Sequence, residues 1–175
     1  KRMFSNRITP KQVELFETNK GAEAIKRIFH IANFPETEEE AADILGRKHF
    51  NFLADFITNL KEKYDEGVFL ALELTSPEDR GEERDAFLAI LGKYLYLTGA
   101  YYSYKDASEL IYLERSFKEE AKEELENILL KQFLFIEVAG TSFSDNRDFE
   151  ALRVILRKRL EAKLPTILVS DDKFL

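Results

Sequence analysis

The sequence predicts an α/β protein, a parallel sheet in three layers preceded by a helical segment. Residues 1–64 show helical spacing of apolar residues and no strand-like alternation. From residue 67 onward, short apolar runs alternate with amphipathic stretches of helical length. Because parallel strands are joined by right-handed crossover helices, this alternation indicates helices on both faces of a sheet. We therefore expect an N-terminal helical segment over 1–64 and an α/β core over 65–175.

Capping residues mark where the N-terminal helices begin. Thr9 marks the start of a helix, because a proline follows this threonine and Gln12 completes a capping box. We expect this helix to end near residue 30. Thr37 starts a second helix, predicted to reach about residue 64. Gly46 lies inside this second helix, and we expect the helix to bend or break there.

Apolar runs identify the strands of the core, and amphipathic stretches identify its helices. Ser103 is expected to cap the helix that follows the second strand. The predicted strands are 68–74, 100–103, 133–138 and 165–170. The predicted helices between them are 83–98, 104–115, 117–131 and 148–163. Ligands of parallel sheets bind beyond the carboxyl ends of the strands, so the loops after residues 74, 138 and 170 are the expected positions of a site.

The composition excludes several classes of function. A formal charge of -7 argues against a protein that coats nucleic acid through its overall field. The chain has no cysteine, which excludes disulfides, thiolate zinc sites and thiol nucleophiles. His30 and His49 are too few and too far apart in sequence to predict a metal site or a histidine-based triad. No transmembrane segment or signal peptide is visible, so we expect a cytoplasmic protein without membrane partners.

The acidic loop over 75–84 stands where a phosphate-binding loop would lie. Phosphate loops use glycines to turn backbone N–H groups inward and a lysine to reach the terminal phosphates, whereas this loop has one glycine and no lysine. A degenerate nucleotide site there would use Ser76, Arg80, Gly81 and Arg84. The alternative is a capped helix start beside a solvated acidic loop.

Carboxylates at two strand ends form a candidate metal site. Glu137 lies near the end of the strand 133–138, and Asp171 and Asp172 follow the last strand. Oxygen ligands of this kind bind magnesium or another divalent cation. The alternative interpretation is that these carboxylates are solvated or hydrogen-bonded within the protein.

Aromatic and basic side chains form a candidate surface for single-stranded DNA. Tyr101 and Tyr102 belong to a tyrosine-rich stretch over 94–112 and can stack on unpaired bases. Arg153 and Arg157 lie one helical turn apart and can contact phosphates. The alternatives are that the tyrosines pack around an edge strand and that the arginines lie on a solvated helix face.

The stretches "FLFIEVAGTSF" and "FEALRVILRKRLEAKLPTILVSDD" resemble the ATPase domain of bacterial replicative-helicase loaders of the DnaC/DnaI type, in the AAA+ class. The resemblance covers about residues 67–172. It implies a three-layer sheet of the P-loop NTPase/AAA+ type and a role in DNA replication initiation. The Gly-Lys-Thr/Ser phosphate motif of this family has no counterpart in 75–85. Where the family has two acids this chain has Glu137 and Val138, and the printed sequence stops just after the last predicted strand, before the position of the family's further helix.

The leading hypothesis is a helicase-loader-like protein with a degenerate ATPase site that acts as an adaptor or regulator by protein contact. We expect no catalytic activity and no cofactor, and a replicative helicase or another replication protein as partner. One alternative is an enzyme that depends on a nucleotide or metal and uses Glu137 and Asp171 with ATP or ADP and magnesium. A second alternative is a single-stranded nucleic-acid binder.

Overall fold

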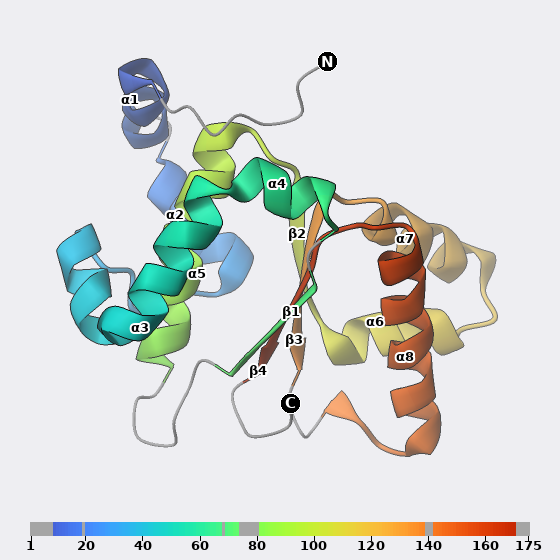
Figure 1. Ribbon diagram of the computed structural model, residues 1–175. Helices are drawn as coiled ribbons and strands as arrows, with labels where there is room; N and C mark the ends of the chain where they lie inside the picture. Colours follow the sequence, from blue (N-terminus) through green and yellow to red (C-terminus); the bar gives the residue numbers. More distant parts are fainter. Residues whose placement is uncertain (1–8, 19, 68, 74–80, 139–141, 171–175) are drawn as a thin grey trace. The chain divides into compact units, whose positions relative to one another are not determined.

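The computed structural model describes residues 9–18, 20–67, 69–73, 81–138 and 142–170, with side chains described outside 69–73. The residues form two compact units, each built from two stretches of the chain (Figure 1). The first unit comprises Lys1–Lys63 and Leu74–Tyr101, and the second comprises Tyr64–Glu73 and Tyr102–Leu175. The domain boundary at residue 64 stays a prediction, because a compact unit need not fold independently.

Helix α5 is the central element of the first unit. The helices of this unit are α1 (Pro10–Thr18), α2 (Gly21–Phe29), α3 (Glu38–Thr58) and α5 (Glu82–Thr98), and α4 (Leu60–Asp65) runs across the unit boundary. Helices α1, α2 and α3 all pack against α5. The side chains of α5 are buried around most of its circumference, as expected of a helix enclosed by other helices.

The capping box at the start of the chain is confirmed, but the helix after it is shorter than predicted. The backbone N–H of Thr9 donates to Gln12 Oε1 at 2.7 Å, and the N–H of Gln12 donates to Thr9 Oγ1 at 3.3 Å. The prediction of one helix to residue 30 is wrong, because α1 ends at Thr18 and α2 begins at Gly21. Between them Lys20 has a φ of 54°, a left-handed conformation that a continuous helix does not allow.

The predicted start and bend of the next helix are both confirmed. The Thr37 side chain accepts a hydrogen bond from the N–H of Glu40 at 3.1 Å. Gly46 has φ 77° and ψ 162° and divides α3 into two helical stretches. A side chain disfavours this conformation, so the position of the bend is determined by glycine.

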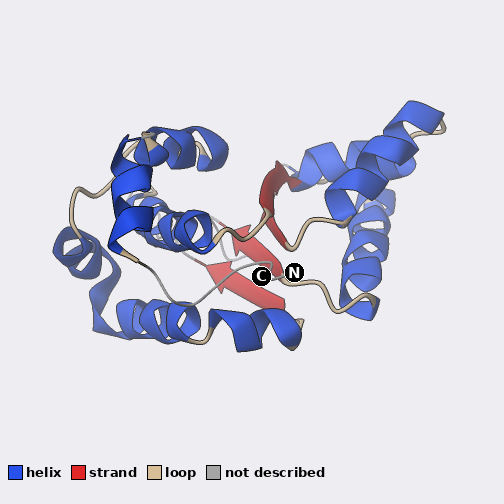
Figure 2. Ribbon diagram, turned by 90° about the horizontal axis from the view of Figure 1, so that it is seen from above, coloured by secondary structure: helices blue, strands red, loops and turns tan. Residues whose placement is uncertain are grey.

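The second unit contains one sheet of four described strands, which Figure 2 shows in red among the helices. The strands are β1 (Phe69–Glu73), β2 (Tyr102–Asp106), β3 (Phe133–Val138) and β4 (Thr166–Ser170). Their order is β1-β4-β3-β2, and all three pairings are parallel. The side chains of β4 are all buried, as are all but one of those of β3, which explains why these strands read as continuous apolar runs.

Three helices cover one face of this sheet: α6 (Ala107–Arg115), α7 (Glu119–Leu129) and α8 (Asn146–Glu161). Leu134, Ile136 and Val138 of β3 point to that face and share a core with all three helices. Leu110, Leu125 and Ile155 are the fully or nearly fully buried contributions of α6, α7 and α8.

The predicted three-layer sheet of the P-loop NTPase/AAA+ type is wrong. The described sheet is small, and the helices of its own unit, α6 to α8, lie on one face of it. Helix α5, which the alternation of elements predicted as a layer on the sheet, instead packs with α1, α2 and α3 in the other unit. Within the first unit, the apolar side chains of α5 point in several directions and pack against these three helices. The chain is therefore a small, largely helical α/β protein.

The boundary between the second strand and its helix was also predicted wrongly. Ser103 does not cap a helix, because β2 continues to Asp106 and α6 begins at Ala107. Tyr104 lies in the strand opposite Phe135. Tyrosine favours strands, and the parallel pairing with β3 extends β2 through the positions that were assigned to the helix.

Candidate functional site

A solvent-open groove of about 320 Å³ lies in the first unit, between the two stretches of α3 and helix α5. Leu53 and Ile90 form its floor and are 1% and 7% exposed. Phe50 and Ile57 are half-buried, while Ala54 and Thr58 are exposed at the groove's mouth. The described lining is therefore mostly apolar but not covered by the protein's own core, as in surfaces that bind another molecule.

The bend at Gly46 is what gives the groove its shape. The stretch before the bend contributes Glu38, the stretch after it contributes Phe50 to Thr58, and α5 contributes Ile90 and Tyr94. A straight helix of this length would carry Glu38 away from Thr58 by about 30 Å, at roughly 1.5 Å per residue. The non-helical glycine brings both stretches to the same groove.

Glu38 and Tyr94 form the polar end of the groove. The Tyr94 hydroxyl donates to Glu38 Oε1 at 2.7 Å. Burial raises the pKa of Tyr94 to about 12, with further contributions from this hydrogen bond and from the charge of Glu38. The phenol therefore stays protonated at neutral pH and remains a donor. Of the described residues that line the groove, Glu38 is the only aspartate, glutamate, lysine, arginine or histidine.

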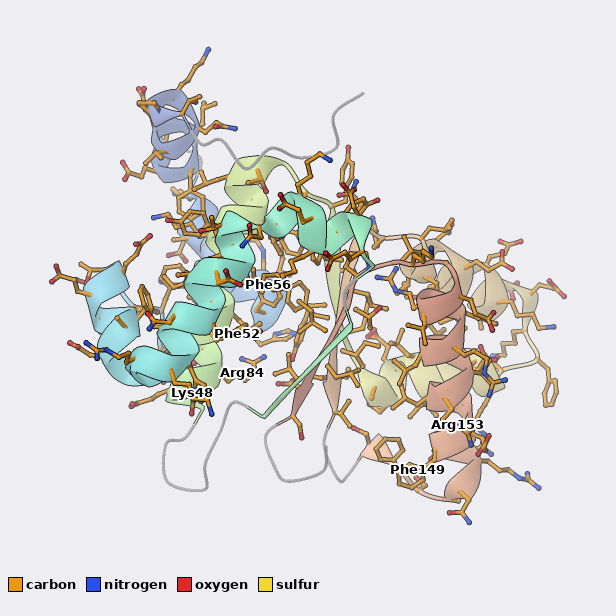
Figure 3. The ribbon with its side chains drawn as sticks, in the orientation of Figure 1. Lys48, Phe52, Phe56, Arg84, Phe149 and Arg153 are labelled. Atoms are coloured by element: carbon orange, nitrogen blue, oxygen red, sulfur yellow. The ribbon has the colours of Figure 1, made fainter. Side chains whose placement is uncertain are left out.

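Other side chains of α3 lie away from the groove. Phe52 and Phe56 follow each other along the helix, with Lys48 one turn earlier (Figure 3). Phe56 is buried and its ring lies 6.3 Å from that of Phe52, which is 42% exposed. The imidazole of His49 contacts the carboxylate of Glu83 of α5, so the second stretch of α3 is also attached to α5 by a polar contact.

The predicted nucleotide residues contribute to the structure of the first unit where they are described. Ser76 and Arg80 lie outside the described residues. Gly81 has a φ of 84° and precedes α5. Arg84 is buried, and its guanidinium donates to the Phe29 carbonyl at 2.7 Å and to Asp85 Oδ1 at 2.9 Å. These contacts join the start of α5 to the end of α2.

The predicted metal ligands are described only in part. Glu137 accepts a short hydrogen bond from the Tyr104 hydroxyl, and Asp106 lies opposite it in the β2–β3 register. Asp171 and Asp172 lie outside the described residues. Among the described residues, no group of three or more His, Asp or Glu side chains is placed to hold a metal ion.

Among the predicted nucleic-acid residues of the second unit, Tyr102 lies on a different side of the sheet from the helix that carries Arg153 and Arg157. Tyr101 is 58% exposed and ends the first unit, whereas the others belong to the second unit. The Tyr102 ring packs edge-on against Phe135, which points away from the face covered by α8. Arg153 and Arg157 lie on the exposed side of α8, where Arg153 pairs with Glu150 at 2.9 Å (Figure 3).

A buried arginine of α8 is a structural centre that the sequence pattern did not reveal. Arg159 is 1% exposed, and burial lowers its pKa to about 10, so it stays charged at neutral pH. Its guanidinium donates to Thr166 Oγ1 and to several backbone carbonyls that lie before β3 and β4. The carbonyl acceptors are Leu129, Lys131, Gln132 and Pro165. These contacts fix the N-terminal ends of two strands relative to α7 and α8.

A polar pocket of about 380 Å³ in the second unit is already balanced in charge. Arg115 and Asp148 both line it, and their side chains form an ion pair at 2.5 Å. Asp148 also accepts the Ser144 N–H at 2.7 Å. That backbone hydrogen bond, followed by the contact with Arg115, lowers the pKa of Asp148. The groove in the first unit is the stronger candidate for recognition, because it is open to solvent and its lining residues are mostly apolar.

Comparison with known proteins assigns no family to the chain, since no protein-family model matches it and no curated protein matches it significantly. None of the described helices is both long and apolar enough to cross a membrane.

Proposed function

We propose that this protein acts as an adaptor or regulator by binding another protein in the groove between α3 and α5. The observation that supports the proposal is a solvent-open, mostly apolar groove in which the half-buried Ile57 lies beside the buried Leu53 and Ile90. Apolar grooves between helices bind the apolar face of a partner helix, and buried apolar anchors contribute most of the affinity in such complexes. The proposal requires no cofactor and no chemical step.

The partner in this proposal is a replicative helicase or another protein of DNA replication initiation. Only the sequence resemblance to helicase loaders supports this choice, and that resemblance stays a prediction. The groove supports binding of a protein, and its lining does not identify which one.

Binding of the purified full chain to the purified replicative helicase, measured by calorimetry, tests the proposal. We expect saturable binding that Ile57→Asp abolishes, because the change places a carboxylate in the apolar wall of the groove. Ala54→Gln adds bulk at an exposed groove position without removing a core side chain, so it tests the same surface if Ile57→Asp unfolds the protein.

Leu160→Asp is the matched control, since Leu160 is 58% exposed on α8 in the other unit. It makes a similar change of polarity away from the groove and should leave binding unchanged. Equal binding by the wild type and both groove variants would refute the groove as the site. Absence of any binding would remove the helicase as the partner.

A further inference from the structure

We infer that the groove recognises a basic amphipathic helix, whose apolar side chains enter the groove while a neighbouring lysine or arginine pairs with Glu38. This inference rests on the proposed function and specifies the chemistry of the partner.

The length of the groove fits about two turns of a bound helix. The groove follows α3 from Phe50 to Thr58, which is about 12 Å at 1.5 Å per residue. Two helical turns span roughly 11 Å and present apolar side chains at i, i+3 or i+4, and i+7 to one side. A helix with anchors at this spacing can therefore cover Leu53, Ile57 and Ile90 together.

The charge of Glu38 at the end of the groove determines which residue type the partner helix needs beside its apolar side chains. Glu38 is exposed, and none of the lysines, arginines or histidines in the described part of the chain pairs with it. Its described side-chain contact is the Tyr94 hydroxyl on Oε1, whereas a carboxylate has about four acceptor positions. A partner that covers the groove removes water from the remaining positions, which is unfavourable unless a donor or cation replaces it.

The local charge favours a cation over a neutral donor. Glu38 lies in the first turn of α3, and the helix dipole supplies only about half a positive charge there. The end of the groove therefore carries net negative charge at neutral pH. A lysine or arginine of the partner complements that charge, whereas an acidic flank would be repelled.

Selection from a library of random 15-residue peptides displayed on phage, with the full chain as bait, tests the inference. We expect enriched peptides to combine apolar residues at helical spacing with a lysine or arginine within about one turn of them. Their binding should weaken at least about tenfold on Glu38→Lys and should be lost on Ile57→Asp. Selection with the Glu38→Lys protein should enrich aspartate or glutamate at the same position.

Two other results of the selection would overturn the inference, provided that circular dichroism shows that the variants are folded. Groove-dependent peptides without a basic preference would overturn the inference and leave the adaptor proposal intact. Peptides unaffected by both Ile57→Asp and Ala54→Gln, or no enriched peptides, would overturn the inference, and the helicase titration would then decide the proposed function separately.

Discussion

Two charged side chains, one in each unit, are used in opposite ways. Arg159 in the second unit is 1% exposed, and backbone carbonyls and Thr166 accept its hydrogen bonds. Glu38 in the first unit is exposed beside an apolar groove and pairs with none of the cations in the described residues. The difference teaches that a charge satisfied inside the protein stabilises the fold, whereas a charge still in water beside apolar surface is suited to recognition.

Removing the buried charge should have the largest effect. Arg159→Ala leaves carbonyls such as those of Leu129 and Lys131 without their donor and opens a cavity, so we expect a loss of about 3–5 kcal/mol in the free energy of unfolding. Urea unfolding measures it. Arg157→Ala, an exposed arginine on the same helix, should change stability by less than about 0.5 kcal/mol. Equal effects of the two variants would contradict the structural role of Arg159.

Changing the glycine at the bend that forms the groove should have the second largest effect on stability. At Gly46 an added Cβ would meet no atom within 4 Å, so Gly46→Ala tests the backbone conformation alone. The strained φ and ψ should lower the free energy of unfolding by about 1–3 kcal/mol, measured by urea unfolding, and should weaken groove-dependent binding. A variant that is as stable as the wild type and binds equally well would show that the bend does not need glycine.

The contribution of the Arg115–Asp148 ion pair to stability should be lost at acid pH. Because the folded-state pKa of Asp148 lies below its ordinary value, its contribution is present above about pH 4 and is lost as the pH falls through the ordinary pKa toward the lowered one. The thermal midpoint of Asp148→Asn should therefore fall less than that of the wild type between about pH 5 and about pH 2. The exposed variant Glu150→Gln should follow the wild type, and a parallel pH profile for Asp148→Asn would contradict the assignment.

Neutralising the groove charge should have the smallest effect on stability. Glu38→Gln should change the free energy of unfolding by less than about 0.5 kcal/mol, because Glu38 is exposed and its hydrogen bond to Tyr94 can be kept. Because the pKa of Tyr94 is raised, the protonated phenol stabilises the fold below about pH 10, and this contribution to the free energy of unfolding is lost as the pH rises toward 12.

The same variant should lower the pKa of Tyr94 only in part, because burial remains while the charge of Glu38 is lost, and phenolate absorbance measures the change. Tyr94→Phe identifies which of the tyrosine transitions belongs to this residue. An unchanged late transition in Glu38→Gln would show that the charge of Glu38 does not act on Tyr94.

Local features of the fold could be read from the sequence, and long-range features could not. The caps at Thr9 and Thr37 and the bend at Gly46 depend on residues within one or two turns, so their patterns are visible in sequence. The arrangement of the layers depends on which elements bury α5. Apolar residues surround most of this helix, and such a pattern is compatible with packing against helices or against a sheet. The end of β2 was misjudged because pairing with β3 outweighed the serine cap expected at Ser103.

The groove could not be predicted because its walls come from distant parts of the chain. Glu38, Ile57 and Ile90 meet only after α3 bends and packs against α5. One signal was present in the sequence. The apolar residues of the second stretch of α3, Phe52, Leu53, Phe56 and Ile57, form a stripe about 140° wide at roughly 100° per residue, which is broader than one buried seam requires.

The insertion of β1 between the two stretches of the first unit has a consequence for how the protein can be dissected. The chain passes from one unit to the other after Lys63, after Glu73 and again after Tyr101. No single cleavage can therefore separate the units intact. A fragment ending near residue 64 would carry α1, α2 and α3 without α5, so limited proteolysis or truncation should yield unstable pieces rather than two autonomous modules.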